Sequence, residues 1–84
     1  MENNEITVDQ NVSYDWSEFK TRLKAKFDMS IMEWCEARKV VYSSLNGLRY
    51  NMWTPEQGYG PAALRIIELA LKDELIVPQD KRAA

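Results

Sequence analysis

The longest helical pattern in the chain lies between residues 61 and 77, just before Pro78, which cannot continue a helix. At about 100° per residue, its apolar side chains cover more than half of a helix circumference, wider than the stripe of an ordinary surface helix. They are Ala63, Leu64, Ile66, Ile67, Ala70, Leu71 and Leu75. Such a wide arc needs cover from two sides, so we expect the rest of the chain to pack around this helix.

A second helical pattern runs from about residue 15 to residue 27. Asp15 and Glu18 have the spacing of a capping box, which predicts a helix start. Apolar residues then recur on one face, and basic residues border them: Trp16, Phe19, Leu23 and Phe27, with Lys20 and Lys24 on one side and Arg22 and Lys26 on the other. Such flanks suit an anionic partner, but long basic side chains also cover the rim of a buried face. Packing is the simpler interpretation.

A third helix is predicted over residues 31–45. Ser30 and Glu33 repeat the capping-box spacing, and Asn46-Gly47 is typical of the left-handed residue that ends a helix. The expected apolar face contains Ile31, Trp34, Val41, Tyr42 and Leu45.

Arg38 projects from the centre of that apolar face. An unpaired charge inside a protein is costly, so its guanidinium needs a carboxylate or an aromatic ring. The sequence offers Trp34, Glu68 or Glu74 for this, or the last carbonyl groups of the helix at 15–27. The alternative is that Arg38 anchors a partner.

The segment from residue 49 to residue 60 is rich in both turn formers and aromatic residues. Thr54-Pro55-Glu56-Gln57 predicts a short helical turn, which Gly58 and Gly60 cut off. Long ordered loops are often functional, and interfaces are enriched in tryptophan, tyrosine, methionine and arginine. The candidate partner-binding residues are Arg49, Tyr50, Met52, Trp53 and Tyr59. The same aromatic residues could instead fold back and cap the core.

The sequence therefore predicts a small all-α bundle of three main helices (about 15–27, 31–45 and 61–77) with a short helical turn near 54–57. A chain of 84 residues has room for one domain. We expect a flexible acidic arm at 1–13, a helical domain at 14–78 and a flexible tail at 79–84. So small a core favours a dimer or a protein partner.

Composition excludes several classes of function. The chain has no histidine and one cysteine, which removes the commonest general base and metal ligand and any internal disulfide. We expect no enzyme, no metal and no cofactor. No apolar run is long enough to span a bilayer and no signal peptide opens the chain, which predicts a cytoplasmic protein.

The net charge of −2 does not favour nucleic-acid binding, which normally needs a basic domain. A helix-turn-helix alignment with Gly47 at the turn is poor, because Pro55 and Gly58 fall where the reading helix must continue. The sequence thus favours a small non-enzymatic protein-binding module, an adaptor, inhibitor or assembly factor, that uses the 49–60 segment. The alternative is a nucleic-acid-associated regulator that uses the basic flanks of the helix at 15–27.

Overall fold

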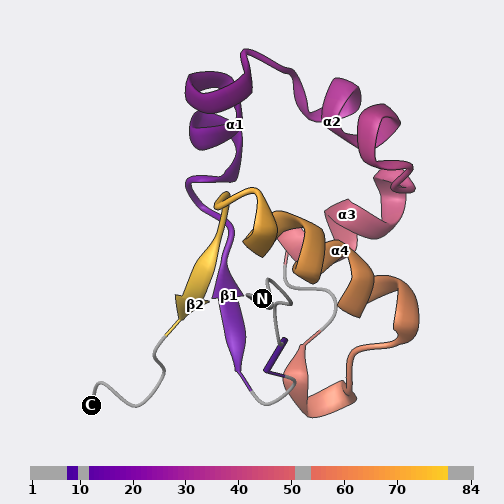
Figure 1. Ribbon diagram of the computed structural model, residues 1–84. Coiled ribbons are helices and arrows are strands. Elements are labelled where there is room, and N and C mark those ends of the chain that lie inside the picture. Colours follow the sequence, from indigo (N-terminus) through magenta and orange to yellow (C-terminus); the bar gives the residue numbers. More distant parts are fainter. Residues whose placement is uncertain (1–7, 10–11, 51–53, 80–84) are drawn as a thin grey trace, which may run out of the picture.

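The computed structural model describes residues 8–9, 12–50 and 54–79. These residues form four α-helices, one turn of 3-10 helix and two short strands. In chain order they are β1 (Ser13–Asp15), α1 (Phe19–Phe27), α2 (Ile31–Arg38), α3 (Tyr42–Arg49), η1 (Pro55–Gln57), α4 (Pro61–Lys72) and β2 (Val77–Gln79). Figure 1 shows α4 crossing the middle of the fold, with α3 packed against it and the two strands beside its C-terminal end.

The protein is mostly helical, as predicted, but it is not the predicted all-α bundle of three main helices, because the described residues form four α-helices and a two-stranded sheet. The short helical turn predicted near 54–57 is η1. One boundary of each predicted main helix is wrong, whereas the predicted end at residue 27 and the predicted starts at residues 31 and 61 are confirmed. The first begins four residues late, the second is two separate helices, and the third ends at Lys72. Each difference has a local cause in the backbone.

The strands β1 and β2 pair antiparallel, with Tyr14 opposite Pro78. Because of this pairing, Asp15 lies in β1 and not in the predicted helix. Asp15 caps no helix: its Oδ1 accepts hydrogen bonds from the backbone N and the Oγ of Ser17, at 3.0 and 2.7 Å. The helix α1 starts at Phe19 without a side-chain cap. The capping box of Ser30 and Glu33, in contrast, is present at the start of α2.

The chain leaves α2 after Arg38 because Lys39 adopts the left-handed conformation, with φ of 58°. The N–H groups of Lys39 and Val40 then donate to the carbonyl groups of Glu36 and Cys35, at 3.4 and 2.8 Å. This is a Schellman ending, and it buries the residue that follows the left-handed one, here Val40. The predicted helix end at Asn46-Gly47 is wrong, because both residues lie inside α3.

Lys39→Gly should stabilise the fold, because a side chain in the left-handed region costs about 1 kcal/mol that glycine does not pay. We expect the melting temperature to rise by several degrees, since about 1 kcal/mol moves a domain of this size by 4–8 °C. Thermal unfolding followed by circular dichroism measures this. Lys39→Ala is the matched control and should give no such gain, and an unchanged melting temperature for the glycine variant would contradict the assigned backbone conformation.

The core lies between α4 and the other elements. Four α4 residues of the predicted apolar arc are buried: Ala63, Ile66, Ile67 and Ala70. The helix ends early because Glu74 is left-handed, with φ of 60°, and the N–H of Leu75 donates to the carbonyl of Ala70 at 2.9 Å. Leu75 and Ile76 are then buried as the chain turns into β2. The other side of the core contains an edge-to-face pair, Phe19 and Trp34, with ring centroids 5.2 Å apart.

A polar network ties α2 to the end of α4. The Arg38 guanidinium donates through Nε and Nη2 to the two carboxylate oxygens of Asp73, at 2.9 and 3.0 Å. The Trp34 indole N–H donates to Asp73 Oδ2 at 2.8 Å. Because the Asp73 side chain is only 12% exposed, these charge-assisted bonds form away from most of the solvent.

No helix among the residues that the structure describes is long and apolar enough to cross a bilayer.

Candidate functional site

The helix α3 presents a polar, uncharged face to solvent. Because α3 is a separate helix, Leu45 and Leu48 face the core, and the opposite side lies exposed. At about 100° per residue, four side chains fall within roughly 100° of arc on that side. We call Tyr42, Ser43, Asn46 and Tyr50 the α3 face. Val41, which precedes the helix, is 64% exposed, so the prediction that Val41 and Tyr42 are core residues is wrong.

One residue of the α3 face is held by a neighbour on the same helix. Arg49 Nη1 donates to the Asn46 side-chain oxygen Oδ1 at 3.1 Å. This bond holds the amide oxygen of Asn46 toward Arg49, so the amide N–H groups lie on the other side. Asn46 is therefore oriented before any ligand arrives.

Two cations lie beside the turn between α2 and α3. Lys39 is exposed in the turn itself, and Arg65 reaches the turn from α4. Arg65 Nη1 donates to the carbonyl oxygen of Lys39 at 3.3 Å. This contact supports the backbone of the turn and brings a second positive charge to the start of α3.

The basic residues of α1 do not share one surface. Lys20 and Lys24 line a groove beside the start of α2. Lys24 also pairs with Asp28 at 2.7 Å, and Lys26, on the other flank, pairs with Glu74 at 3.0 Å. Arg22 is partly buried on the same flank as Lys26. The charge of α1 is thus divided between two sides and is partly neutralised.

The candidate residues of the 49–60 segment point in different directions. Tyr50 is 64% exposed. Tyr59 packs against the core, and its hydroxyl donates to the carbonyl of Val12 at 3.1 Å. Burial raises the pKa of the Tyr59 hydroxyl, and Tyr14 and Glu56 add to this rise. Met52 and Trp53 lie outside the described residues.

Two other candidates are engaged inside the molecule. Arg38 forms hydrogen bonds to Asp73, a carboxylate that the sequence interpretation did not consider. Arg49 is half-buried, with its guanidinium carbon 5.2 Å from the centre of the Tyr50 ring and 6.0 Å from that of Phe19. Neither guanidinium is displayed as an anchor on an open surface.

The described residues bring few nucleophilic or metal-ligating side chains together. Cys35 is buried, and this burial raises the pKa of its thiol, although the nearby Arg49 charge opposes the rise. A protonated, buried thiol is a poor nucleophile. Across residues 8–9, 12–50 and 54–79, no group of three metal-ligating side chains comes together.

Sequence interpretation missed Ser43, Asn46, Lys39 and Arg65 as site residues. The available signal was the Val40-Val41 pair, since two β-branched residues after Lys39 are poor helix formers. That pair marks the turn, and moving the turn from Gly47 to Lys39 brings the α3 face to the surface.

No protein-family model matches the chain, and comparison with curated proteins and with solved structures gives no significant match.

Proposed function

We propose that this protein binds double-stranded DNA through a helix-turn-helix formed by α2 and α3, with α3 in the major groove. The observation that carries the proposal is the unit itself: two eight-residue helices joined by the three-residue turn Lys39–Val41. DNA-binding motifs of this class join two helices by a turn of three or four residues and read bases with the second helix. The sharp change of direction between α2 and α3 is visible in Figure 1.

The side chains of α3 suit base reading. Ser43 and Asn46 can hydrogen-bond to base edges, and the Tyr42 ring can contact a thymine methyl group. Because Arg49 holds the Asn46 oxygen, the Asn46 N–H groups are the ones offered, and they favour the O6 and N7 acceptors of guanine. These contacts come from the first two turns of α3, where recognition helices meet the bases.

The charges predict how such a complex responds to salt. Lys39 and Arg65 flank the start of α3 and are placed to meet phosphates, whereas Glu33 and Glu36 on α2 repel them. Two or three phosphate contacts give a slope of log affinity against log salt of about −2 to −3. With a net charge of −2, non-specific binding should be weak. The affinity then depends mostly on base contacts.

The test is selection of binding sites from a randomised duplex library, followed by fluorescence anisotropy with the selected duplex. Ser43→Ala and Asn46→Ala should each weaken binding by about 5- to 150-fold, the effect of losing a base contact worth roughly 1–3 kcal/mol. Arg65→Gln should reduce the salt slope by about one and weaken binding to all duplexes alike.

Lys72→Gln is the matched control, because Lys72 is an exposed cation at the far end of α4 and should leave binding unchanged. If no duplex is enriched over several rounds, the proposed function is wrong. Equal binding by wild type and the Ser43 and Asn46 variants would remove α3 as the reading helix.

A homodimer remains part of the proposal. Small domains often supplement their cores by association, and helix-turn-helix proteins commonly bind two half-sites about one helical turn apart as dimers. A selected site with two-fold symmetry, together with a two-to-one complex in sedimentation, supports this state. A single half-site bound by one chain contradicts it.

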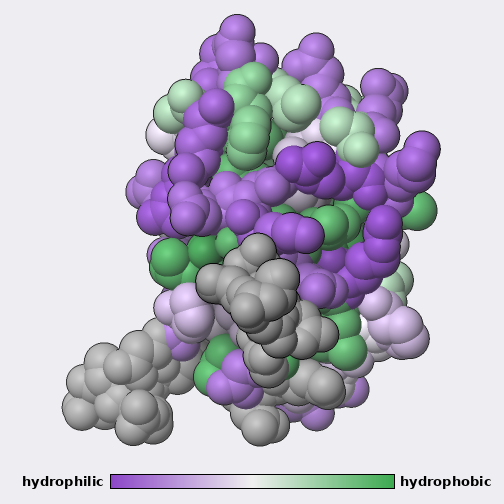
Figure 2. Space-filling view, in the orientation of Figure 1, coloured by the Kyte–Doolittle hydropathy of each residue, from purple (hydrophilic) through white to green (hydrophobic). Residues whose placement is uncertain are grey.

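A second candidate function is non-enzymatic protein binding, and the observation that favours it is exposed apolar surface. Tyr50 is 64% exposed, and Met32, which is 52% exposed, lines a groove of about 580 Å³ between α1 and α2. Figure 2 shows hydrophobic (green) atoms among hydrophilic (purple) ones at the top of the molecule, where α1 and α2 lie in Figure 1. The salt titration separates the two functions, since aromatic anchors in a protein groove do not weaken steeply with salt.

A further inference from the structure

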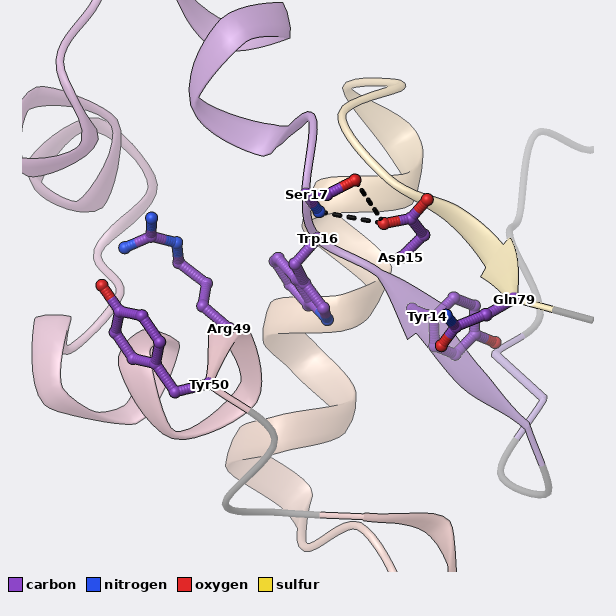
Figure 3. A pocket seen from close by; sticks show the side chains of 7 residues that line it. All are labelled: Tyr14, Asp15, Trp16, Ser17, Arg49, Tyr50 and Gln79. Atoms are coloured by element: carbon purple, nitrogen blue, oxygen red, sulfur yellow. Dashed lines mark hydrogen bonds between the residues drawn. The ribbon is translucent and has the colours of Figure 1, made fainter. Parts of the chain in front are cut away.

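A polar pocket lies between the C-terminal end of α3 and the segment that links β1 to α1. It has a volume of about 310 Å³ and is lined by Tyr14, Asp15, Trp16, Ser17, Arg49, Tyr50 and Gln79. Figure 3 shows Arg49 and Tyr50 on one side of this pocket, and Trp16, Asp15 and Ser17 on the other. This size is at the lower end of the range for small-molecule sites.

Arg49 brings to this pocket a charge that no described residue balances. Within the described part of the chain, no carboxylate lies within ion-pair distance of its guanidinium. Its Nε is buried and has no hydrogen-bond acceptor there. The other contacts are one bond to Asn46 and the rings of Phe19 and Tyr50. A buried donor without a hydrogen-bond partner is destabilising, and more so when the group is charged.

The nearest acidic residue of the pocket does not supply this counter-charge. Asp15 uses its Oδ1 for the two bonds from Ser17, and these bonds lower the pKa of its carboxyl group, so the group stays charged. In Figure 3 this carboxylate lies across the pocket from Arg49. The pocket therefore has, at one end, a cation without an ion-pair partner among the described residues and, at the other, a fixed negative charge.

From this arrangement we propose that the pocket binds an oxyanion, a carboxylate or phosphate group, through the guanidinium of Arg49. The flat fork of an arginine matches both groups in a bidentate geometry. The rings of Trp16 and Tyr50 at the pocket offer a planar surface for a ring attached to the anion. The occupant is a small aromatic acid or phosphate ester, or a DNA backbone phosphate beside α3, since the same chemistry serves both.

The test is a titration of the full chain with phenyl phosphate and with inorganic phosphate at constant ionic strength, followed by isothermal calorimetry and by tryptophan fluorescence. We expect saturable binding of phenyl phosphate in the micromolar to millimolar range and weaker binding of inorganic phosphate. A control titration with sodium chloride alone should give no binding signal. Arg49→Gln should weaken binding at least tenfold. Lys72→Gln, which removes an exposed cation outside the pocket, should leave binding unchanged.

Asp15→Asn is the decisive second variant, because removing the fixed negative charge should tighten binding several-fold. An arginine with a merely structural role would not produce that gain, and the variant stays informative if Arg49→Gln fails to fold. Competition between phenyl phosphate and a selected duplex identifies a DNA phosphate as the occupant, and simultaneous binding identifies a small ligand. The absence of saturable binding, or equal binding by wild type and Asp15→Asn, would overturn the proposal. Neither result affects the test of the proposed function, which is the selection of a duplex.

Discussion

Asp73→Ala should lower the free energy of unfolding by about 2–4 kcal/mol, a large fraction of the stability of a small domain. The mostly buried carboxylate accepts three hydrogen bonds, two from Arg38 and one from the Trp34 indole. Without it, a half-buried guanidinium and a buried indole N–H lose their partner, and the link between α2 and the end of α4 is broken. Urea unfolding followed by circular dichroism measures the loss.

The chain supplies a matched control for this change. Glu74, the next residue, pairs with Lys26 at 3.0 Å on the surface, with 77% of its side chain exposed. Exposed pairs contribute about 0–1 kcal/mol, so Glu74→Ala should be nearly neutral. Trp34→Phe, which removes the indole N–H bond but keeps an aromatic ring, should fall between the two. Equal losses for the Asp73 and Glu74 variants would show that the network does not hold α2 to α4.

Local chemistry could be predicted where it depends on neighbouring residues. The capping box of Ser30 and Glu33 is present, and the apolar arc of α4 is buried at Ile66 and Ile67. The run Thr54-Pro55-Glu56-Gln57, followed by Gly58 and Gly60, predicted the short turn η1. In each case the signal lies within a few residues, and no distant contact is needed to decide the structure.

The remaining features depend on contacts that a local pattern does not contain. The helices α1, α2 and α4 end at left-handed residues that are not glycine, Asp28, Lys39 and Glu74, so the usual sign of a helix end is missing. The hydrophobic period even favoured continuity across Lys39, because Trp34 and Val41 are seven residues apart, which is two turns on one helix face. The strands β1 and β2 are three residues each and form only because distant parts of the chain meet.

The candidate site was missed for the same reason. If residues 31–45 formed one helix, Tyr42 would face the core and Asn46 would end the helix, leaving no reading surface. Once the chain turns at Lys39, α3 is rotated relative to α2, and its polar residues become a continuous face. The position of one left-handed residue thus decides whether the chain has the α3 face on which the proposed DNA binding depends.

Val40→Asp and Val41→Asp should therefore have opposite effects, although the residues are adjacent and the change is the same. Val40 is 8% exposed in the core, so a carboxylate there should cost more than about 3 kcal/mol and unfold much of the protein. Val41 is exposed at the N-cap of α3 and makes no side-chain capping bond. Aspartate is a preferred N-cap, so Val41→Asp should stabilise by about 0.5–1 kcal/mol.

Denaturant unfolding of both variants measures these effects, and DNA binding gives an independent readout. Val41→Asp places a negative charge where α3 would enter the major groove, so it should weaken duplex binding at least tenfold while raising stability. Val41→Ser is the neutral control: it can cap the same helix and should keep the affinity. A continuous helix over 31–45 requires the reverse order of stabilities, with Val41→Asp the more damaging change. That result would eliminate the turn at Lys39 and, with it, α3 as a separate reading helix.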